Sequence, residues 1–260
     1  MGERGPEGPP GKTSGIDDMC KWIPDIVLNQ FERNEQVCLL ITDPRFDLHK
    51  GDDAYLTWVS RSTLGKNANA DNAATASKSV LHIADKKNAL VFKNCFYWVD
   101  DVMLLPPTGY TAICVTFMID GNQDMTIVSD FSDVGGLQDP FCEISASNKE
   151  IRVWGADSKT SYVPIKYETR KNKWTTIFVE WKSNGDGFFM INDMEIHGKF
   201  TSKRTLKYSV GGFSIGARDG KTPRFLNGDI SSVDVYVNQH SIPDRLRTLL
   251  TSRRMIKKTE

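Results

Sequence analysis

Two acidic turns carry the side chains best suited to chemistry in this 260-residue sequence. The first places Asp120 and Asp124 around Gly-Asn-Gln, and the second places Asp130 and Asp133 around Phe-Ser. Carboxylate and carbonyl oxygens on loops are the ligands that Ca²⁺ takes in proteins. We therefore predict these four aspartates as candidate calcium ligands. Ordinary acidic turns are the alternative, because the spacing departs from that of an EF-hand loop.

A second set of residues has the form of a catalytic motif. Residues 212–216, Gly-Phe-Ser-Ile-Gly, match the Gly-x-Ser-x-Gly pattern of serine hydrolases, whose serine sits on a sharp turn from a strand into a helix. Ser214 lies within a strand-like run that a turn follows, so we predict a structural role for it. Retaining glycosidases need two carboxyl groups about 5 Å apart, and no strand offers such a pair. We therefore predict no catalytic residue and no enzyme activity.

The five cysteines are Cys20, Cys38, Cys95, Cys114 and Cys142, and no two of them have Cys-x-x-Cys spacing. The zinc and thioredoxin-type motifs that need this spacing are therefore excluded. All five are disulfide candidates, and in an extracellular protein an odd number leaves one thiol free or bonded to another chain. Cys20 suits an interchain bond, and an intrachain bond between Cys20 and Cys38 is the alternative.

Composition bounds the class of protein. Lys plus Arg and Asp plus Glu number 33 each, so the formal net charge is zero and nothing favours nucleic acid or an anionic membrane as a partner. No run of apolar residues is long enough to cross a bilayer, so we expect no membrane insertion. The basic residues of 253–260 are predicted to form a solvated tail.

The first residues have a period of three. Residues 2–13 are four consecutive Gly-X-Y triplets, with proline in both the X and Y positions. Only glycine fits the crowded axis of a collagen triple helix, which gives this period a steric cause. A flexible Gly/Pro tail is the alternative. We predict that residues 1–13 end a collagen-like segment, that the chain forms a homotrimer with other collagen-like chains, and that it is secreted.

Residues 14–53 are predicted to form a neck or linker. Four apolar residues between 16 and 26 have the 3-4-3 spacing of coiled-coil a and d positions. Pro24 argues against one continuous helix because proline lacks the N–H and clashes with the preceding turn. A short helix that begins near Pro24 is the better prediction. The small, polar stretch 66–78 predicts a loop.

The rest of the chain has strand patterns at short intervals, with turn residues between them. In 111–119 and 174–181 the odd positions form β-branched and aromatic faces, and 111–119 is predicted to be a central strand. Further strands are predicted at 37–41, 54–59, 80–83, 89–93, 95–99, 126–131, 141–146, 150–154, 162–167, 188–191, 195–197, 211–216 and 226–237. These patterns predict an all-β, two-sheet antiparallel sandwich.

Local signals complete this fold prediction. Asn-Asp-Met at 192–194 predicts a hairpin turn with a residue at positive φ. Residues 241–244 resemble a capping box, and Ile242, Leu246, Leu249 and Leu250 then share one helical face. The sequence therefore predicts a short C-terminal helix after the last strand.

The strand blocks 89–94, 111–119, 174–181 and 188–196 resemble the laminin-G-like, concanavalin-A-like jelly rolls. The ending 213–216 and 226–236, followed by a short leucine-bearing helix, is the most specific part of the resemblance. The resemblance covers about residues 56–250, and we assign 54–252 to this domain. It implies two packed antiparallel sheets, a role in adhesion or in glycan or protein binding, and in many members one calcium ion at the sandwich rim. Trp154 is either a sugar-stacking platform or a core residue.

These observations predict a non-catalytic extracellular matrix or adhesion protein. Its jelly-roll head, at the end of a collagen-like chain, binds an extracellular protein or glycan, and trimer formation strengthens this binding by avidity. One alternative is that the head serves mainly as a collagen trimerisation domain. Another is a polysaccharide-active enzyme on a glucanase-like jelly roll, whose Glu-x-Asp-x-Glu motif is absent from this sequence.

Overall fold

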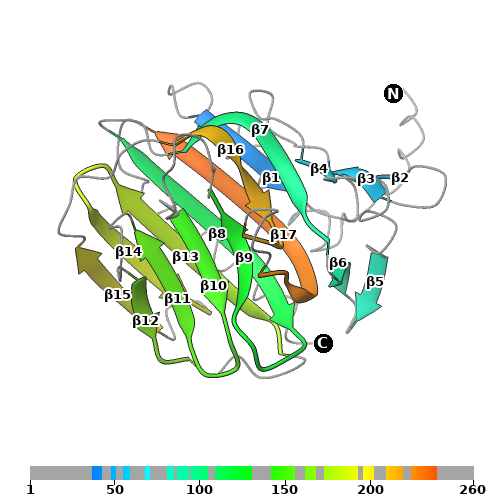
Figure 1. Ribbon diagram of the computed structural model, residues 1–260. Coiled ribbons are helices and arrows are strands. Elements are labelled where there is room, and N and C mark those ends of the chain that lie inside the picture. Colours follow the sequence, from blue (N-terminus) through cyan, green and yellow to red (C-terminus); the bar gives the residue numbers. More distant parts are fainter. Residues whose placement is uncertain are drawn as a thin grey trace, which may run out of the picture.

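The computed structural model describes residues 37–42, 48–50, 55–58, 68–70, 81–84, 87–93, 95–104, 109–130, 142–155, 162–167, 173–192, 196–201, 209–218 and 224–238. Within these ranges the chain is all-β, and its strands form two antiparallel sheets packed as a sandwich (Figure 1). The predicted fold class is therefore confirmed. The predicted neck helix and C-terminal helix lie outside the described residues. No helix in the described part is long and apolar enough to span a membrane.

The first sheet, called sheet A, has the strand order β15-β14-β13-β8-β17-β6-β5. β1 pairs with residues 233–237 of β17, whereas β6 pairs with residues 227–230. Its strands are β1 (Val37–Thr42), β5 (Leu81–Ala84), β6 (Lys87–Lys93), β8 (Tyr110–Ile119), β13 (Thr175–Lys182), β14 (Asp186–Ile191), β15 (Ile196–Thr201) and β17 (Asn227–Asn238).

The second sheet, called sheet B, has the order β12-β11-β10-β9-β16-β7-β4-β3-β2. Its strands are β2 (Leu48–Lys50), β3 (Tyr55–Trp58), β4 (Ala68–Ala70), β7 (Tyr97–Leu104), β9 (Met125–Ser129), β10 (Cys142–Ala146), β11 (Ile151–Gly155), β12 (Tyr162–Ile165) and β16 (Ser209–Ile215).

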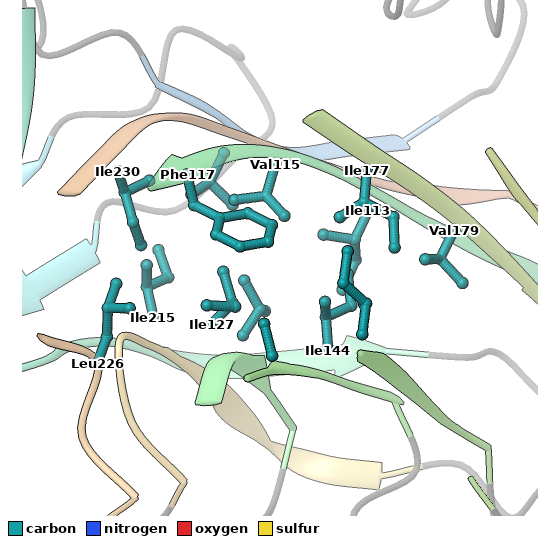
Figure 2. Close-up of a cluster of buried hydrophobic side chains, with 14 of the residues drawn as sticks. Ile113, Val115, Phe117, Ile127, Ile144, Ile177, Val179, Ile215, Leu226 and Ile230 are labelled. Carbon is teal, nitrogen blue, oxygen red and sulfur yellow. The ribbon is translucent and has the colours of Figure 1, made fainter. Parts of the chain in front are cut away.

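The core fills the space between the two sheets. In Figure 2, Val115 and Phe117 of β8 point from sheet A toward Ile127 and Ile215 of sheet B. Side chains alternate along a strand, so the odd positions predicted for 111–119 and 174–181 reach this core together. Burial of each such side chain stabilises the fold by about 2 kcal/mol, so the alternating apolar pattern specifies which face of each strand packs inward.

The last strand, β17, agrees with the run predicted at 226–237, but its pairing with β8 is irregular. Ile230 and Val233 both lie in the core although they are three positions apart, a spacing that regular alternation places on opposite faces. A register shift between Ile230 and Ser232 adds one residue against β8 and turns both side chains inward.

Two short strands lie where the sequence predicts a linker or a loop. β2 falls within 14–53 and pairs with β3, whereas β1 coincides with the strand predicted at 37–41 and pairs with β17. β4 falls within 66–78, so the loop prediction is wrong there. Its Ala-Asn-Ala sequence has weak strand propensity, but β3 and β7 offer backbone partners on both sides, and this pairing outweighs propensity.

The hairpin turn after β14 is confirmed. Asn192 has a φ of 45°, and its backbone N–H donates to the Thr176 carbonyl at 2.9 Å. Its side-chain Oδ1 accepts from the Thr176 N–H at 2.9 Å, and its Nδ2 contacts the Tyr167 hydroxyl. Asparagine tolerates positive φ and ties the turn to β13.

Gly228 is packed against the backbone of β8, and this predicts a large substitution effect. A Cβ at Gly228 lies 2.1 Å from the Met118 carbonyl oxygen, so Gly228→Ala is expected to lower the free energy of unfolding by about 2 kcal/mol or more. Urea denaturation measures this loss.

Gly121→Ala is the matched control. Gly121 shares the φ of 158°, but its added Cβ meets only the terminal methyl of the flexible Met125 side chain, at 2.7 Å. The expected loss is under about 1 kcal/mol. Equal losses for the two variants contradict the explanation by backbone contact.

Candidate functional site

The four predicted calcium ligands do not converge in the described residues. Asp120 and Asp124 belong to the turn before β9, whereas Asp130 follows β9 at its other end. Six residue steps along a strand separate Asp124 from Asp130 by about 20 Å. Asp130 is buried, and its Oδ1 accepts from the Cys142 N–H at 2.8 Å. Asp133 lies outside the described residues.

No group of three or more His, Cys, Asp or Glu side chains in the described part of the chain is placed to hold a metal. Asp120 and Asp124 therefore lie apart from Asp130, and calcium binding by any of the four aspartates stays a prediction. A calcium ion bound at the rim by other partners stays a prediction.

Two turns meet at one end of sheet B and carry polar side chains from separate parts of the chain. Met125 pairs with Ala146, so the turn before β9 and the turn after β10 lie side by side. The Asn148 Nδ2 donates to the Asn122 Oδ1 at 3.1 Å across them. We call the following set the rim cluster: Asn122, Asp124, Asn148, Glu150, Arg152 and Tyr162.

Arg152 of β11 is at the centre of the rim cluster. Its Nε donates to the Glu150 Oε1 at 2.6 Å, and its Nη1 is bonded to the Asp124 Oδ2. Its guanidinium carbon lies 4.9 Å from the centroid of the Tyr162 ring, a cation–π contact. The guanidinium is therefore held in one orientation by three neighbours.

The neighbours of Arg152 favour its positively charged form. Burial lowers the pKa of Arg152, but the bonds to Glu150 and Asp124 outweigh burial, so the pKa lies above its ordinary value. The side chains of Arg152, Glu150 and Asp124 remain 21%, 24% and 36% exposed. The rim cluster thus presents charged, amide and aromatic groups to solvent in a fixed arrangement, as a recognition site requires.

The backbone of Trp154, in β11, pairs with the strands on both sides. Its backbone pairs with Glu143 of β10 and with Tyr162 of β12. Its side chain lies outside the described part, so both interpretations of Trp154 stay open.

A buried ion pair, missed by the sequence reasoning, lies next to the rim cluster on sheet B. Glu143 of β10 is fully buried, and Arg218, in the turn after β16, is 14% exposed. Their contact is bidentate, with Arg218 Nε to Glu143 Oε2 at 2.6 Å and Arg218 Nη2 to Glu143 Oε1 at 3.0 Å. Ser129 and Thr126 of β9 also donate to the carboxylate, at 3.1 and 3.4 Å.

Burial has the largest effect on the pKa of Glu143. Burial raises the pKa of the Glu143 carboxyl, and the bonds and charges of Arg218, Ser129 and Arg224 lower it by less. The only sequence signal for this pair is a glutamate in the otherwise apolar and small run of β10. Its partner is 75 residues away, which no local pattern indicates.

Ser214 has the structural role that the sequence predicts. It is buried within β16, and its hydroxyl lies 2.5 Å from the Ala217 carbonyl oxygen and 3.2 Å from the Ser129 carbonyl oxygen. A hydroxyl that donates to backbone carbonyls inside a strand is not a nucleophile elbow.

Three of the five cysteines are described with their side chains. Cys95, Cys114 and Cys142 are buried as thiols, which corrects the disulfide prediction for these three. Burial, followed by the charge of Asp130, raises the pKa of Cys142, so its thiol is unreactive. Cys20 and the side chain of Cys38 lie outside the described part, so an interchain bond through either stays a prediction.

Comparison with known proteins defines the fold. No family model and no curated protein matches this chain. A sialidase of Trypanosoma rangeli solved in complex with sialic acid is similar, with a TM-score of 0.57 and 11% identity over 86% of this chain. The chain spans 34% of that sialidase. At this identity the likeness establishes a shared β-sandwich, jelly-roll-like architecture.

Two smaller proteins are also similar. The CBM40 of the Ruminococcus gnavus IT-sialidase has a TM-score of 0.45 and 13% identity, covering 58% of this chain and 93% of that domain. A heptameric SAP-like pentraxin of Limulus polyphemus has a TM-score of 0.44 and 15% identity, covering 58% of this chain and 72% of the pentraxin.

The Glu143–Arg218 pair predicts a pH-dependent substitution effect. In Arg218→Gln, Glu143 keeps its burial and loses its main cation, so its pKa rises further. A carboxyl whose folded pKa is raised destabilises the fold as pH rises above its unfolded pKa of about 4.3. We expect a loss of about 3 kcal/mol or more at about pH 7.5 and a smaller loss at about pH 4.5, measured by urea denaturation.

Arg152→Gln is the control for this substitution. It breaks a partly exposed ion pair and is expected to cost about 1 kcal/mol or less at neutral pH. An Arg218→Gln penalty that is the same at both pH values contradicts a buried, ionised Glu143.

Proposed function

We propose that this chain is the head of an extracellular, collagen-like matrix or adhesion protein, and that the head binds a glycan through the rim cluster. The observation that carries this proposal is Arg152, held over the Tyr162 ring between Asp124 and Glu150 at a solvent-exposed edge. Carboxylates and guanidinium groups suit sugar hydroxyls as hydrogen-bond partners, and the aromatic ring suits the apolar face of a sugar.

The fold and the first residues support the same proposal. The T. rangeli sialidase, whose sandwich architecture this chain shares, was solved in complex with sialic acid. The Gly-X-Y triplets of residues 2–13 favour a trimer in a laminin-G-like matrix protein. A trimer presents three rim clusters together, and this raises weak single-site binding by avidity.

A polysaccharide-degrading enzyme is the weaker candidate. Asp229 and Asp234 of β17 are separated by about 16 Å along the strand, farther than the carboxyl pair of a glycosidase. Both are buried, so this strand offers no open acid–base pair.

The rim cluster predicts a loss of binding in Tyr162→Ala and Arg152→Gln. An oligosaccharide array identifies a bound glycan, and calorimetry with that glycan is expected to show each variant at least about tenfold weaker, or about 1.4 kcal/mol. Lys199→Gln, at an exposed position on the opposite sheet, removes one charge and is expected to bind as the unmodified chain does. Equal binding by all four proteins excludes the rim cluster as the site.

The proposed trimer predicts that the full chain and a chain without residues 1–33 differ in oligomeric state. Sedimentation of the full chain is expected to give a trimer, and removal of residues 1–33 is expected to give a monomer that still binds the glycan. A stable trimer after this removal supports the alternative, a head that serves mainly in trimerisation.

A further inference from the structure

Two arginines face one carboxylate beside the rim cluster. Arg218 forms the bidentate pair with Glu143, and the charge of Arg224 also acts on this carboxylate. The Arg224 carbonyl accepts from the Thr126 N–H at 3.1 Å, and the Thr126 hydroxyl donates to Glu143. Burial raises the pKa of Glu143 and the charges of Arg218 and Arg224 lower it, so Arg224 is within electrostatic range of the carboxylate.

Glu143 has no capacity left for the second arginine. A carboxylate offers about four acceptor positions, and Glu143 accepts two bonds from Arg218, one from Ser129 and one from Thr126. The Arg224 Nη1 is buried and has no hydrogen-bond partner. A buried donor without an acceptor costs about 1–3 kcal/mol, and more when it is charged.

The unpaired donor indicates the kind of ligand that it can take. An incoming acceptor with negative charge forms the bond that the buried Arg224 Nη1 lacks. The planar guanidinium fork matches carboxylate, sulfate and phosphate groups through paired hydrogen bonds.

The position of Arg224 connects it to the rim cluster. Arg152 pairs in register with Ser145, Ser145 pairs with Thr126, and Thr126 is bonded to the backbone of Arg224. This row crosses about three strand spacings, or about 14 Å. An oligosaccharide of a few residues bridges such a distance.

We propose that Arg224, supported by the Glu143–Arg218 pair, is an anion subsite that selects glycans with a carboxylate or sulfate group next to the part bound at the rim cluster. This inference rests on the proposed glycan binding for its ligand. The subsite itself rests on the unpaired buried donor and can be tested without any sugar.

The first test uses inorganic sulfate as the probe. Thermal unfolding of the full chain is compared in sodium sulfate and sodium chloride at equal ionic strength, for the unmodified chain, Arg224→Gln and Lys199→Gln. Sulfate stabilises most proteins to some extent, so the difference between chains is the result. We expect sulfate to raise the midpoint of the unmodified chain and of Lys199→Gln by about 2 °C or more beyond its effect on Arg224→Gln.

The unpaired donor adds a second readout without sulfate. Arg224→Gln removes the unpaired donor together with a charge that lowers the pKa of Glu143, so it is expected to lose much less stability in chloride than Arg218→Gln does. Equal sulfate effects in the three chains overturn the subsite. A large loss of stability in Arg224→Gln overturns it as well, because the arginine then has a structural partner.

The second test uses one neutral oligosaccharide from the array together with its sulfated and its carboxylated forms. The unmodified chain is expected to bind one or both anionic forms at least about tenfold more tightly than the neutral form. Arg224→Gln is expected to keep neutral binding and lose this preference, and Arg224→Lys to retain part of it. The two anionic forms distinguish a sulfated from a carboxylated ligand.

The outcomes separate the two proposals. Loss of all binding in Tyr162→Ala, with loss of only the anionic preference in Arg224→Gln, supports both. Unchanged preference in Arg224→Gln overturns the subsite and leaves the rim cluster. Absence of any glycan binding, with a sulfate effect that depends on Arg224, overturns the proposed function and supports the anion subsite.

Discussion

The antiparallel pairing of β8 with β13 on one side and β17 on the other is the contact on which the rest of the structure depends. β8 contributes Ile113, Val115 and Phe117 to the core and is hydrogen-bonded along its length to both neighbours. The Thr116 and Thr176 hydroxyls add a buried bond at 2.9 Å. Because these partners are distant in sequence, the core forms only when long loops close, which favours slow folding.

The second sheet depends on this core for its position and then bears the polar groups. Ile127, Ile144 and Ile215 anchor β9, β10 and β16 against sheet A (Figure 2). The same strands carry Thr126, Ser129, Glu143 and Ser214, whose polar groups are paired with one another, with Arg218 or with backbone carbonyls. Such a buried polar network gives little net stability, but removing one member is costly, so it specifies a single arrangement of the turn after β16.

The rim cluster and the Glu143–Arg218 pair differ in exposure, and this difference separates their roles. The side chains of Arg152, Glu150 and Asp124 are 21%, 24% and 36% exposed to solvent, so each can exchange its protein partner for a ligand. Glu143 has no exposed surface and can only position Arg218. The Arg224 Nη1 is a buried donor for which the described structure supplies no acceptor.

The sequence by itself determined the sandwich class, the central position of 111–119, the inward faces of β8 and β13, and the positive-φ turn at Asn192. Each of these follows from the two-residue alternation of side chains or from the local chemistry of a turn, which a short window of sequence contains. Tertiary structure decided the bulge that turns Ile230 and Val233 inward together, the strand at Ala68–Ala70, and the pairing of Glu143 with Arg218. It also decided that Asp124 meets Arg152 and not Asp130. These contacts join residues that no local period relates, because only sheet register brings them to the same place.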